Sequence, residues 1–100
     1  MNDDPMRVTF SSRAKADVQG IWNYTVERWG RSQAEIYLRL IGAAVESMAA
    51  DPSVGRPCDD VRLGYRKYLV GSHVLFYRVT GKAIFVVRIL HQRMDIERHL

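Results

Sequence analysis

The fold is decided by residues 11–51, which read SSRAKADVQGIWNYTVERWGRSQAEIYLRLIGAAVESMAAD. In the first half of this stretch, apolar side chains recur at the three- and four-residue spacing of one helical stripe. The stripe consists of Val18, Ile21, Trp22, Thr25, Val26 and Trp29. Ser11 and Ser12 offer hydroxyl groups that can cap the start of a helix, and Gly30 can adopt the left-handed backbone that stops one. We therefore predict a helix over residues 12–29.

The second half of the stretch predicts another helix, over residues 32–50. Ser32 and Glu35 have the spacing of a capping box, and Asp51-Pro52 ends the pattern. Between them the helical stripe consists of Ala34, Tyr37, Leu38, Ile41, Val45 and Met48. A connection of about two residues is long enough only for an antiparallel hairpin, whose apolar stripes must face each other or a common sheet.

The segments on either side of the helical hairpin are predicted to be strands. Each strand is rich in β-branched and aromatic residues, and the last two connections carry Gly71-Ser72 and Thr80-Gly81-Lys82, which suit tight turns. The strands span residues 7–10, 65–70, 73–79 and 83–90; residues 52–61 form a loop, and residues 94–100 form either a short helix or an extension. The order β-α-α-β-β-β predicts an α+β fold, in which the hairpin covers one face of a four-stranded, mainly antiparallel sheet and the other face is partly open.

Composition predicts one globular domain spanning residues 1–100. A chain of 100 residues with 47% hydrophobic residues is too short to support two cores. No apolar run is long enough for a membrane span, and the acidic start does not resemble a signal peptide, so we expect a cytoplasmic protein without membrane contact. Cys58 is the only cysteine, which excludes an intrachain disulfide, and the histidines show no zinc-site spacing. We expect neither a metal nor a cofactor.

Positive charge is concentrated in the second half of the chain. Residues 1–60 carry seven basic and nine acidic side chains, whereas residues 61–100 carry eight basic and two acidic ones. Residues 61–94 contain seven cations and no acid. This distribution favours an anionic partner, such as nucleic acid, phosphate or an acidic protein segment, and the alternative is a solvated face without a partner.

Arg88 is the exception in an otherwise apolar strand. Both alternating sets of side chains in residues 83–90 are hydrophobic, so we expect this strand to be central and buried on two sides. Burying an unpaired guanidinium is costly. Arg88 is therefore expected either to pair with an acid, Asp17 or Glu46, or to point into a surface cleft.

Four segments of the chain resemble the ParE branch of the ParE/RelE toxin–antitoxin superfamily. Residues 17–30 (DVQGIWNYTVERWG) resemble the opening D-L-x-x-I-W-x-Y-x-x-x-x-W-G, and residues 51–57 (DPSVGRP) resemble the loop after the second helix. Residues 65–79 resemble the central hairpin with its H-x-I-F-Y-R motif, and residues 87–95 (VRILHQRMD) resemble V-x-R-I-L-H-x-R-M-D. The resemblance covers nearly the whole chain, in order.

The resemblance implies the toxic component of a type II toxin–antitoxin system. Such a toxin would stabilise the cleaved-DNA complex of DNA gyrase without bond chemistry of its own. A ParD-like antitoxin encoded beside it would neutralise it in a hetero-oligomer, and nucleic acid would be contacted only indirectly or within the gyrase complex. The alternatives are a RelE-like ribosome-dependent mRNA endoribonuclease and a degenerate module that only binds an antitoxin. Val74 and His99 occupy positions where RelE-like nucleases have arginine and tyrosine, which argues against the nuclease. Other residues that a nuclease could use are present: His91 could carry a proton near neutral pH, and the basic side chains are Arg66, Lys67, Arg88 and Arg93.

The candidate site residues divide into two overlapping sets. Candidates for contact with the target are Arg66, Arg88, His91 and Arg93. Candidates for contact with the antitoxin are Arg66, Arg78, Arg88, Trp22 and Trp29, where the antitoxin's apolar residues would fill a groove beside the helical hairpin. Both tryptophans also lie on the apolar stripe, so core packing is their ordinary role.

Three further expectations concern single residues. Asp59 and Asp60 should raise the pKa of the Cys58 thiol, which argues against a reactive nucleophile. His73 and His91 begin and follow neighbouring antiparallel strands and should lie close together. Tyr77 and Arg78 alternate along one strand, so they should point to opposite faces.

Overall fold

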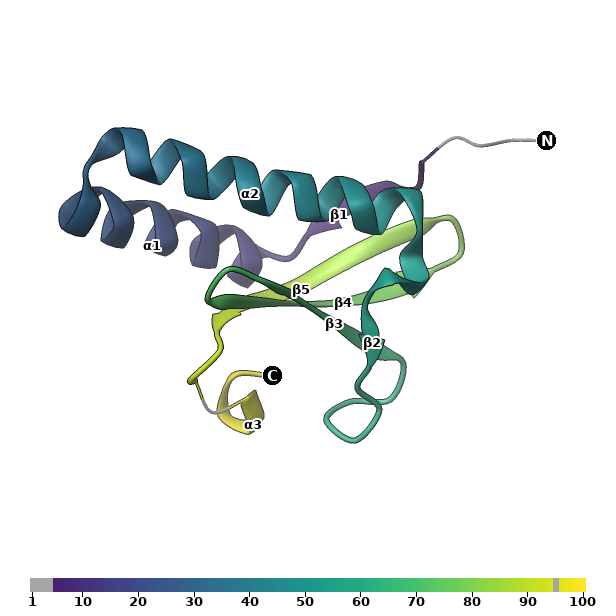
Figure 1. Ribbon diagram of the computed structural model, residues 1–100. Helices are drawn as coiled ribbons and strands as arrows, with labels where there is room; N and C mark the ends of the chain where they lie inside the picture. Colours follow the sequence, from purple (N-terminus) through teal and green to yellow (C-terminus); the bar gives the residue numbers. More distant parts are fainter. Residues whose placement is uncertain (1–4, 95) are drawn as a thin grey trace.

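The computed structural model describes residues 5–94 and 96–100 and shows two helices packed on a mixed five-stranded sheet (Figure 1). The elements are β1 (Arg7–Phe10), α1 (Ser12–Trp29), α2 (Arg31–Ala50), η1 (Pro52–Val54), β2 (Arg56–Pro57), β3 (Tyr65–Val70), β4 (His73–Thr80), β5 (Ala83–His91) and α3 (Ile96–His99). The pair α1 and α2 lies along one side of the sheet, and the short α3 lies on the other (Figure 1). The expected α+β fold and helical hairpin are confirmed. The tail forms a short helix, although Asp95 lies outside the described residues, as do residues 1–4.

The helical hairpin turns within a single residue. Ser11 caps α1, because its Oγ accepts a hydrogen bond of 2.9 Å from the backbone N–H of Ala14. Gly30, with φ of 91°, ends α1 and begins α2 without a side-chain cap. The predicted capping box of Ser32 and Glu35 is therefore wrong. Since α2 begins at Arg31, Ser32 already lies inside the first helical turn.

The sheet contains one strand more than the four predicted. The strand order is β1-β5-β4-β3-β2, with β1 parallel to β5 and the remaining pairs antiparallel. The extra strand, β2, comes from the predicted loop 52–61 and pairs Arg56 with Lys67 and Pro57 with Arg66. Two residues are too few to show an alternating pattern, and proline is tolerated in β2 because it is an edge strand.

A β-bulge in β5 gives this strand buried side chains on both faces. Phe76 pairs with Arg88 and Tyr77 with Val86, so Val87 is the extra residue. Ile84, Val86 and Ile89 therefore join the core beneath the helices, while Leu90 faces the opposite side. There it packs in a second apolar cluster with Cys58 and Phe76, partly covered by Ile96 and Leu100 of the tail. The expected two-sided burial of this strand is confirmed.

The expected core position of Trp29 is wrong. Its side chain is 67% exposed, whereas Trp22, on the same stripe, is partly buried. Figure 1 shows that the turn between α1 and α2 extends past the end of the sheet. The last turn of α1 therefore continues the apolar stripe beyond the strands that would have covered it.

Gly55 lies where the loop after α2 passes directly over a buried tyrosine. The Tyr77 hydroxyl accepts a hydrogen bond of 2.9 Å from the Gly55 N–H and donates one of 2.8 Å to the Pro52 carbonyl. A Cβ at Gly55 would overlap this hydroxyl and lie 2.8 Å from the Lys67 carbonyl oxygen. No residue with a side chain fits without moving the loop or the strand.

We therefore expect Gly55→Ala to lower the free energy of unfolding by about 1–3 kcal/mol, the usual cost of overpacking. Gly42→Ala is the matched control. A Cβ there meets nothing within 4 Å in the middle of an exposed helical turn, so alanine should add about 0.5–1 kcal/mol. Urea unfolding of both variants measures the difference, and equal stabilities would refute the close packing at Gly55.

Candidate functional site

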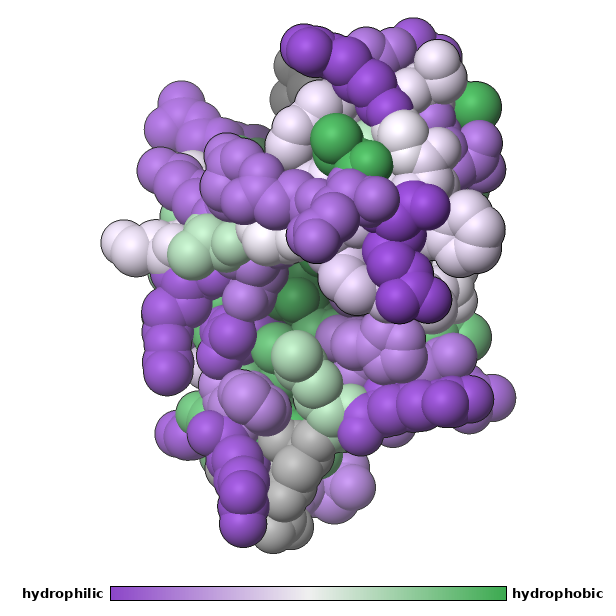
Figure 2. All heavy atoms as spheres, turned by 90° about the vertical axis from the view of Figure 1, so that its left-hand side faces the viewer, coloured by the Kyte–Doolittle hydropathy of each residue, from purple (hydrophilic) through white to green (hydrophobic). Residues whose placement is uncertain are grey.

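An apolar groove opens beneath the overhanging end of the helical hairpin. Its volume is about 1060 Å³, and we call it the hairpin groove. It is lined by Tyr24, Thr25, Trp29, Gln33, Ile36, Tyr37, Arg39, Leu40, Ser72, His73, His91 and Met94. Figure 2 looks onto this end of the molecule and shows apolar residues in a hollow surrounded by hydrophilic ones. Large exposed apolar patches of this kind mark interaction surfaces in soluble proteins.

The walls of the hairpin groove carry large apolar side chains that the fold leaves in contact with water. Besides Trp29, the exposed ones are Tyr24, Ile36, Leu40 and Met94. Sequence reasoning missed Ile36 and Leu40, which form a second apolar stripe on α2, beside the one that faces the core. Their four-residue spacing was the available signal, because a helix that is apolar on two faces usually contacts two surfaces.

A hydrogen-bonded tyrosine and histidine lie at the floor of the groove. The Tyr37 Oη lies 2.6 Å from Nδ1 of His73 and accepts a hydrogen bond of 3.1 Å from the Ser72 N–H. His73 pairs with His91 across β4 and β5, and their rings meet edge to face with centroids 5.4 Å apart. The expected proximity of the two histidines is confirmed.

Burial lowers the pKa of His73 below the usual value for histidine, and the neighbouring His91 lowers it further, against a smaller opposing effect of Asp17. Both effects favour the neutral imidazole over the charged one. The Tyr37 hydroxyl and Nδ1 of His73 share a hydrogen bond in which the tautomer of the ring decides which atom donates.

The lowered pKa of His73 predicts a loss of stability in mild acid. Below the ordinary histidine pKa of about 6.5, the unfolded chain binds a proton that the folded chain resists. The free energy of unfolding must therefore fall as the pH drops from 7.5 to 5.5. Urea unfolding at both pH values should show a smaller fall in His73→Gln than in the unmodified chain or in His99→Gln. An equal fall in all three proteins would contradict the assignment.

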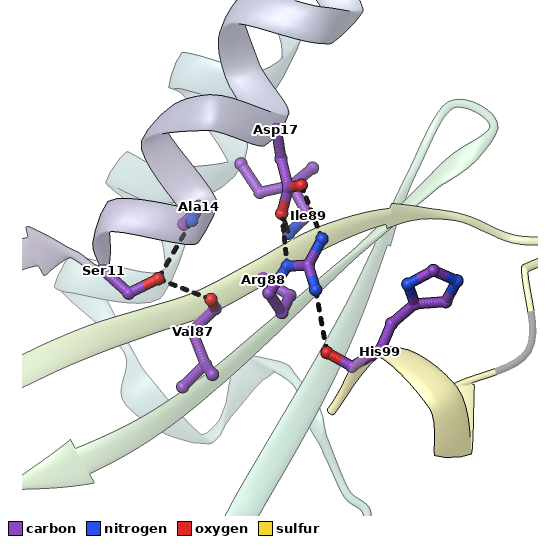
Figure 3. Close-up of polar contacts among 7 residues, drawn as sticks. All are labelled: Ser11, Ala14, Asp17, Val87, Arg88, Ile89 and His99. Carbon is purple, nitrogen blue, oxygen red and sulfur yellow. Dashed lines mark hydrogen bonds and ion pairs between the residues drawn. The ribbon is translucent and has the colours of Figure 1, made fainter.

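Arg88 joins three elements through a buried ion pair (Figure 3). Its Nε and Nη2 each donate a hydrogen bond of 2.8 Å to the carboxylate of Asp17 in α1, and its Nη1 donates one of 2.8 Å to the carbonyl of His99 in α3. Both side chains of the ion pair are nearly buried, with 12% and 13% exposed. Of the alternatives predicted for Arg88, pairing with Asp17 is confirmed. The hydrogen bonds to Asp17 stabilise the charged guanidinium and so raise its pKa.

The start of α1 also replaces β1 as the neighbour of β5. Beyond Val86, no strand among the described residues pairs with β5 on that side, and its backbone groups bond instead to the side chains of the cap residue Ser11 and of Asp17 in α1 (Figure 3). Ser11 Oγ donates to the Val87 carbonyl at 2.6 Å, and the Ile89 N–H donates to Asp17 at 2.9 Å. Asp17 therefore accepts hydrogen bonds both from the guanidinium of Arg88 and from a backbone N–H at the open edge of β5.

The remaining candidate residues do not form one cluster. His91 lines the hairpin groove, and Arg93 follows it in an exposed turn. Arg66 donates a hydrogen bond of 2.6 Å to the Gly55 carbonyl, and Arg78 lies exposed over the ring of Phe85. Tyr77 is buried while Arg78 is exposed, so their expected separation on opposite faces is confirmed.

The thiol of Cys58 is buried, and its pKa is raised, as expected. The main cause is burial rather than Asp59 and Asp60, which contribute smaller effects. Within residues 5–94 and 96–100, no three metal-ligating side chains come together, and no helix is long and apolar enough to cross a membrane.

Comparison with known proteins identifies close relatives. Residues 8–96 match the family described as "ParE toxin of type II toxin-antitoxin system, parDE". The chain is 54% identical over 95 residues to Toxin ParE1 of Mycobacterium tuberculosis (strain CDC 1551 / Oshkosh), and this alignment covers 94% of this chain and 97% of the relative. It is 47% identical over 90 residues to Toxin ParE1 of Caulobacter vibrioides, and that alignment covers 90% of this chain and 93% of the relative.

Solved structures show the same fold. A chain from the "Chromosomal ParDE TA system from P. aeruginosa" superposes with a TM-score of 0.75 at 26% identity, over 86% of this chain and 95% of that one. A chain from the toxin–antitoxin complex RelBE2 of Mycobacterium tuberculosis gives a TM-score of 0.60 at 22% identity, over 87% and 98%. At that identity, the second likeness concerns the fold alone.

Proposed function

The chain belongs to the ParE toxin family of type II toxin–antitoxin systems, and from this membership we propose that it arrests growth in the cytoplasm by binding DNA gyrase. The toxin stabilises the gyrase complex in which DNA is cleaved, so that the break persists, and performs no bond chemistry itself. A ParD-like antitoxin neutralises it in a hetero-oligomer.

The hairpin groove is the observation that carries the antitoxin part of the proposal. Its exposed apolar walls suit the apolar side of an amphipathic segment from another chain. Arg39 lies at the rim, where an acidic residue of that segment can pair with it. Trp29, which is exposed rather than part of the core, is the central apolar anchor for that segment, in agreement with its place among the candidate antitoxin contacts.

The local structure favours a non-enzymatic toxin over an endoribonuclease. Two of the cations that a nuclease would need for phosphate, Arg88 and Arg66, are engaged with Asp17 and with the Gly55 carbonyl. At the position where RelE-like nucleases have arginine, Val74 packs against the second apolar cluster. Guanidinium groups held this way are not free to stabilise a phosphorane.

Expression of the chain in bacteria, with and without the antitoxin encoded beside it, tests the toxin function. We expect growth to stop with the chain alone and to continue when both proteins are made. Normal growth with the chain alone would favour the degenerate antitoxin-binding module. Primer extension on ribosome-bound message from the arrested cells should show no new cuts, and toxin-dependent cuts would favour the endoribonuclease.

A further inference from the structure

The five strands of the sheet contain no aspartate or glutamate. They carry six cations, namely Arg7, Arg56, Arg66, Lys67, Arg78 and Arg88. In the described part of the chain, the carboxylates lie on the helices and loops instead, and the ion pairs found there are Arg31–Glu35 and Arg88–Asp17. Apart from Arg88, none of the six has an ion pair within residues 5–94 and 96–100. Arg66 donates a hydrogen bond to the Gly55 carbonyl, which leaves the four cations Arg7, Arg56, Lys67 and Arg78.

The register of the sheet places these four cations on the face turned away from the α1–α2 hairpin. Residues directly opposite each other in a sheet point to the same side. One row of paired residues crosses β3, β4, β5 and β1 and consists of Tyr65, Arg78, Phe85 and Thr9. In the neighbouring row, Arg56 of β2 is paired with Lys67 of β3. Lys67 in turn faces Phe76, which belongs to the cluster on the side away from the helices.

We call this surface the open strand face. It comprises Arg7, Thr9, Arg56, Tyr65, Lys67, Arg78, Thr80 and Phe85. At about 4.8 Å between strands, its cations extend over roughly 19 Å from β2 to β1. The tail covers the neighbouring Phe76 and Leu90, but Phe85 belongs to neither apolar cluster.

Phe85 and Arg78 form the centre of the open strand face. The Arg78 guanidinium lies over the Phe85 ring at 5.2 Å from its centroid, and Arg78 itself is exposed. Aromatic rings and guanidinium planes on an open sheet are the groups on which unpaired bases stack, while surrounding cations contact phosphates. An acidic peptide would use the cations but would leave the aromatic ring unused.

We propose that the open strand face binds single-stranded nucleic acid, with Phe85 and Arg78 stacking on a base and Arg7, Arg56 and Lys67 contacting phosphates. A single strand fits better than a duplex, because only an unpaired base presents its face to Phe85. The proposal concerns binding alone, with no bond broken. It goes beyond the function proposed above and does not depend on it, because neither gyrase nor an antitoxin is needed for the contact.

The test measures fluorescence anisotropy of a fluorescein-labelled dT 15-mer with the purified full-length chain at 50 and 200 mM NaCl. Three phosphate contacts predict that affinity falls about 20-fold over this range. Loss of base stacking in Phe85→Leu should weaken binding by about 5- to 150-fold. Arg78→Gln, an exposed position that keeps the fold intact, should weaken it about tenfold.

Arg31→Gln is the matched control, since it removes the same charge from an 80% exposed side chain on the hairpin. It should leave affinity within twofold. Equal weakening by Arg31→Gln and Arg78→Gln would overturn the proposal, and so would the absence of saturable binding at 50 mM NaCl. Displacement of the oligonucleotide by polyglutamate as readily as by unlabelled dT 15-mer would also overturn it, since the surface would then bind any polyanion.

Discussion

Asp17→Asn is expected to lower the free energy of unfolding by about 3–5 kcal/mol, the usual cost of removing one partner from a buried ion pair. The guanidinium of Arg88 is only 12% exposed, so water cannot replace the lost carboxylate. The same substitution weakens the acceptor of the Ile89 N–H at the edge of β5. For a chain of this size, the melting temperature should fall by at least about 12 °C.

Glu46→Gln is the matched control for Asp17→Asn. Glu46 is the other acid that the sequence offers as a partner for Arg88, but it is exposed on α2, so its loss should change stability by no more than about 0.5 kcal/mol. Adding Arg88→Met to Asp17→Asn removes the stranded charge and should recover part of the loss. Thermal unfolding followed by circular dichroism measures all three variants. Equal melting temperatures for Asp17→Asn and Glu46→Gln would show that the ion pair does not stabilise the fold.

Trp29→Ala is expected to weaken antitoxin binding by about 2–4 kcal/mol, or about 30- to 1000-fold in Kd. Buried tryptophans at the centre of an interface commonly contribute this much, and Trp29 is the largest exposed side chain in the hairpin groove. Because it is 67% exposed in the free chain, its loss should change the free energy of unfolding by less than about 0.5 kcal/mol. Isothermal titration calorimetry with the antitoxin encoded beside the chain measures the affinity.

A second pair of variants separates the groove from general surface hydrophobicity. Leu40→Ala removes an apolar wall of the hairpin groove, whereas Leu63→Ala removes the same atoms from an 88% exposed position in the loop before β3. We expect weaker binding only for Leu40→Ala. Binding that is unaffected by both Trp29→Ala and Leu40→Ala would place the antitoxin on another surface.

The sequence predicted most of the fold because its signals are local and repeated. Helical spacing marked α1 and α2, and Gly30 marked the turn between them. The charge of Arg88 in an apolar strand predicts either a pairing with an acid, Asp17 or Glu46, or a position in a surface cleft, and the fold shows the pairing with Asp17. The alternation in residues 83–90 predicted burial on both faces, although the bulge at Val87, which decides which residue faces which side, has no local signature.

The features that the sequence did not predict depend on where elements end relative to one another. Trp29 shares its stripe with buried residues, yet it is exposed because the hairpin is longer than the sheet beneath it. Strand β2 forms because the loop after α2 passes the edge of β3. A strand of two residues has no sequence pattern from which it could be predicted. The hairpin groove combines Ile36 and Leu40 of α2 with His73 and His91, which lie more than 30 residues further along the chain in β4 and β5, so only the folded chain brings its walls together.

A gyrase cleavage assay tests the central proposal most directly. The purified full-length chain is incubated with gyrase, ATP and supercoiled plasmid, and the products are separated after denaturation with and without protease. The proposal predicts linear DNA covalently linked to gyrase, in an amount that rises with the toxin and falls when the antitoxin is added first. Plasmid that shows no linear product at micromolar concentrations of the chain would contradict it.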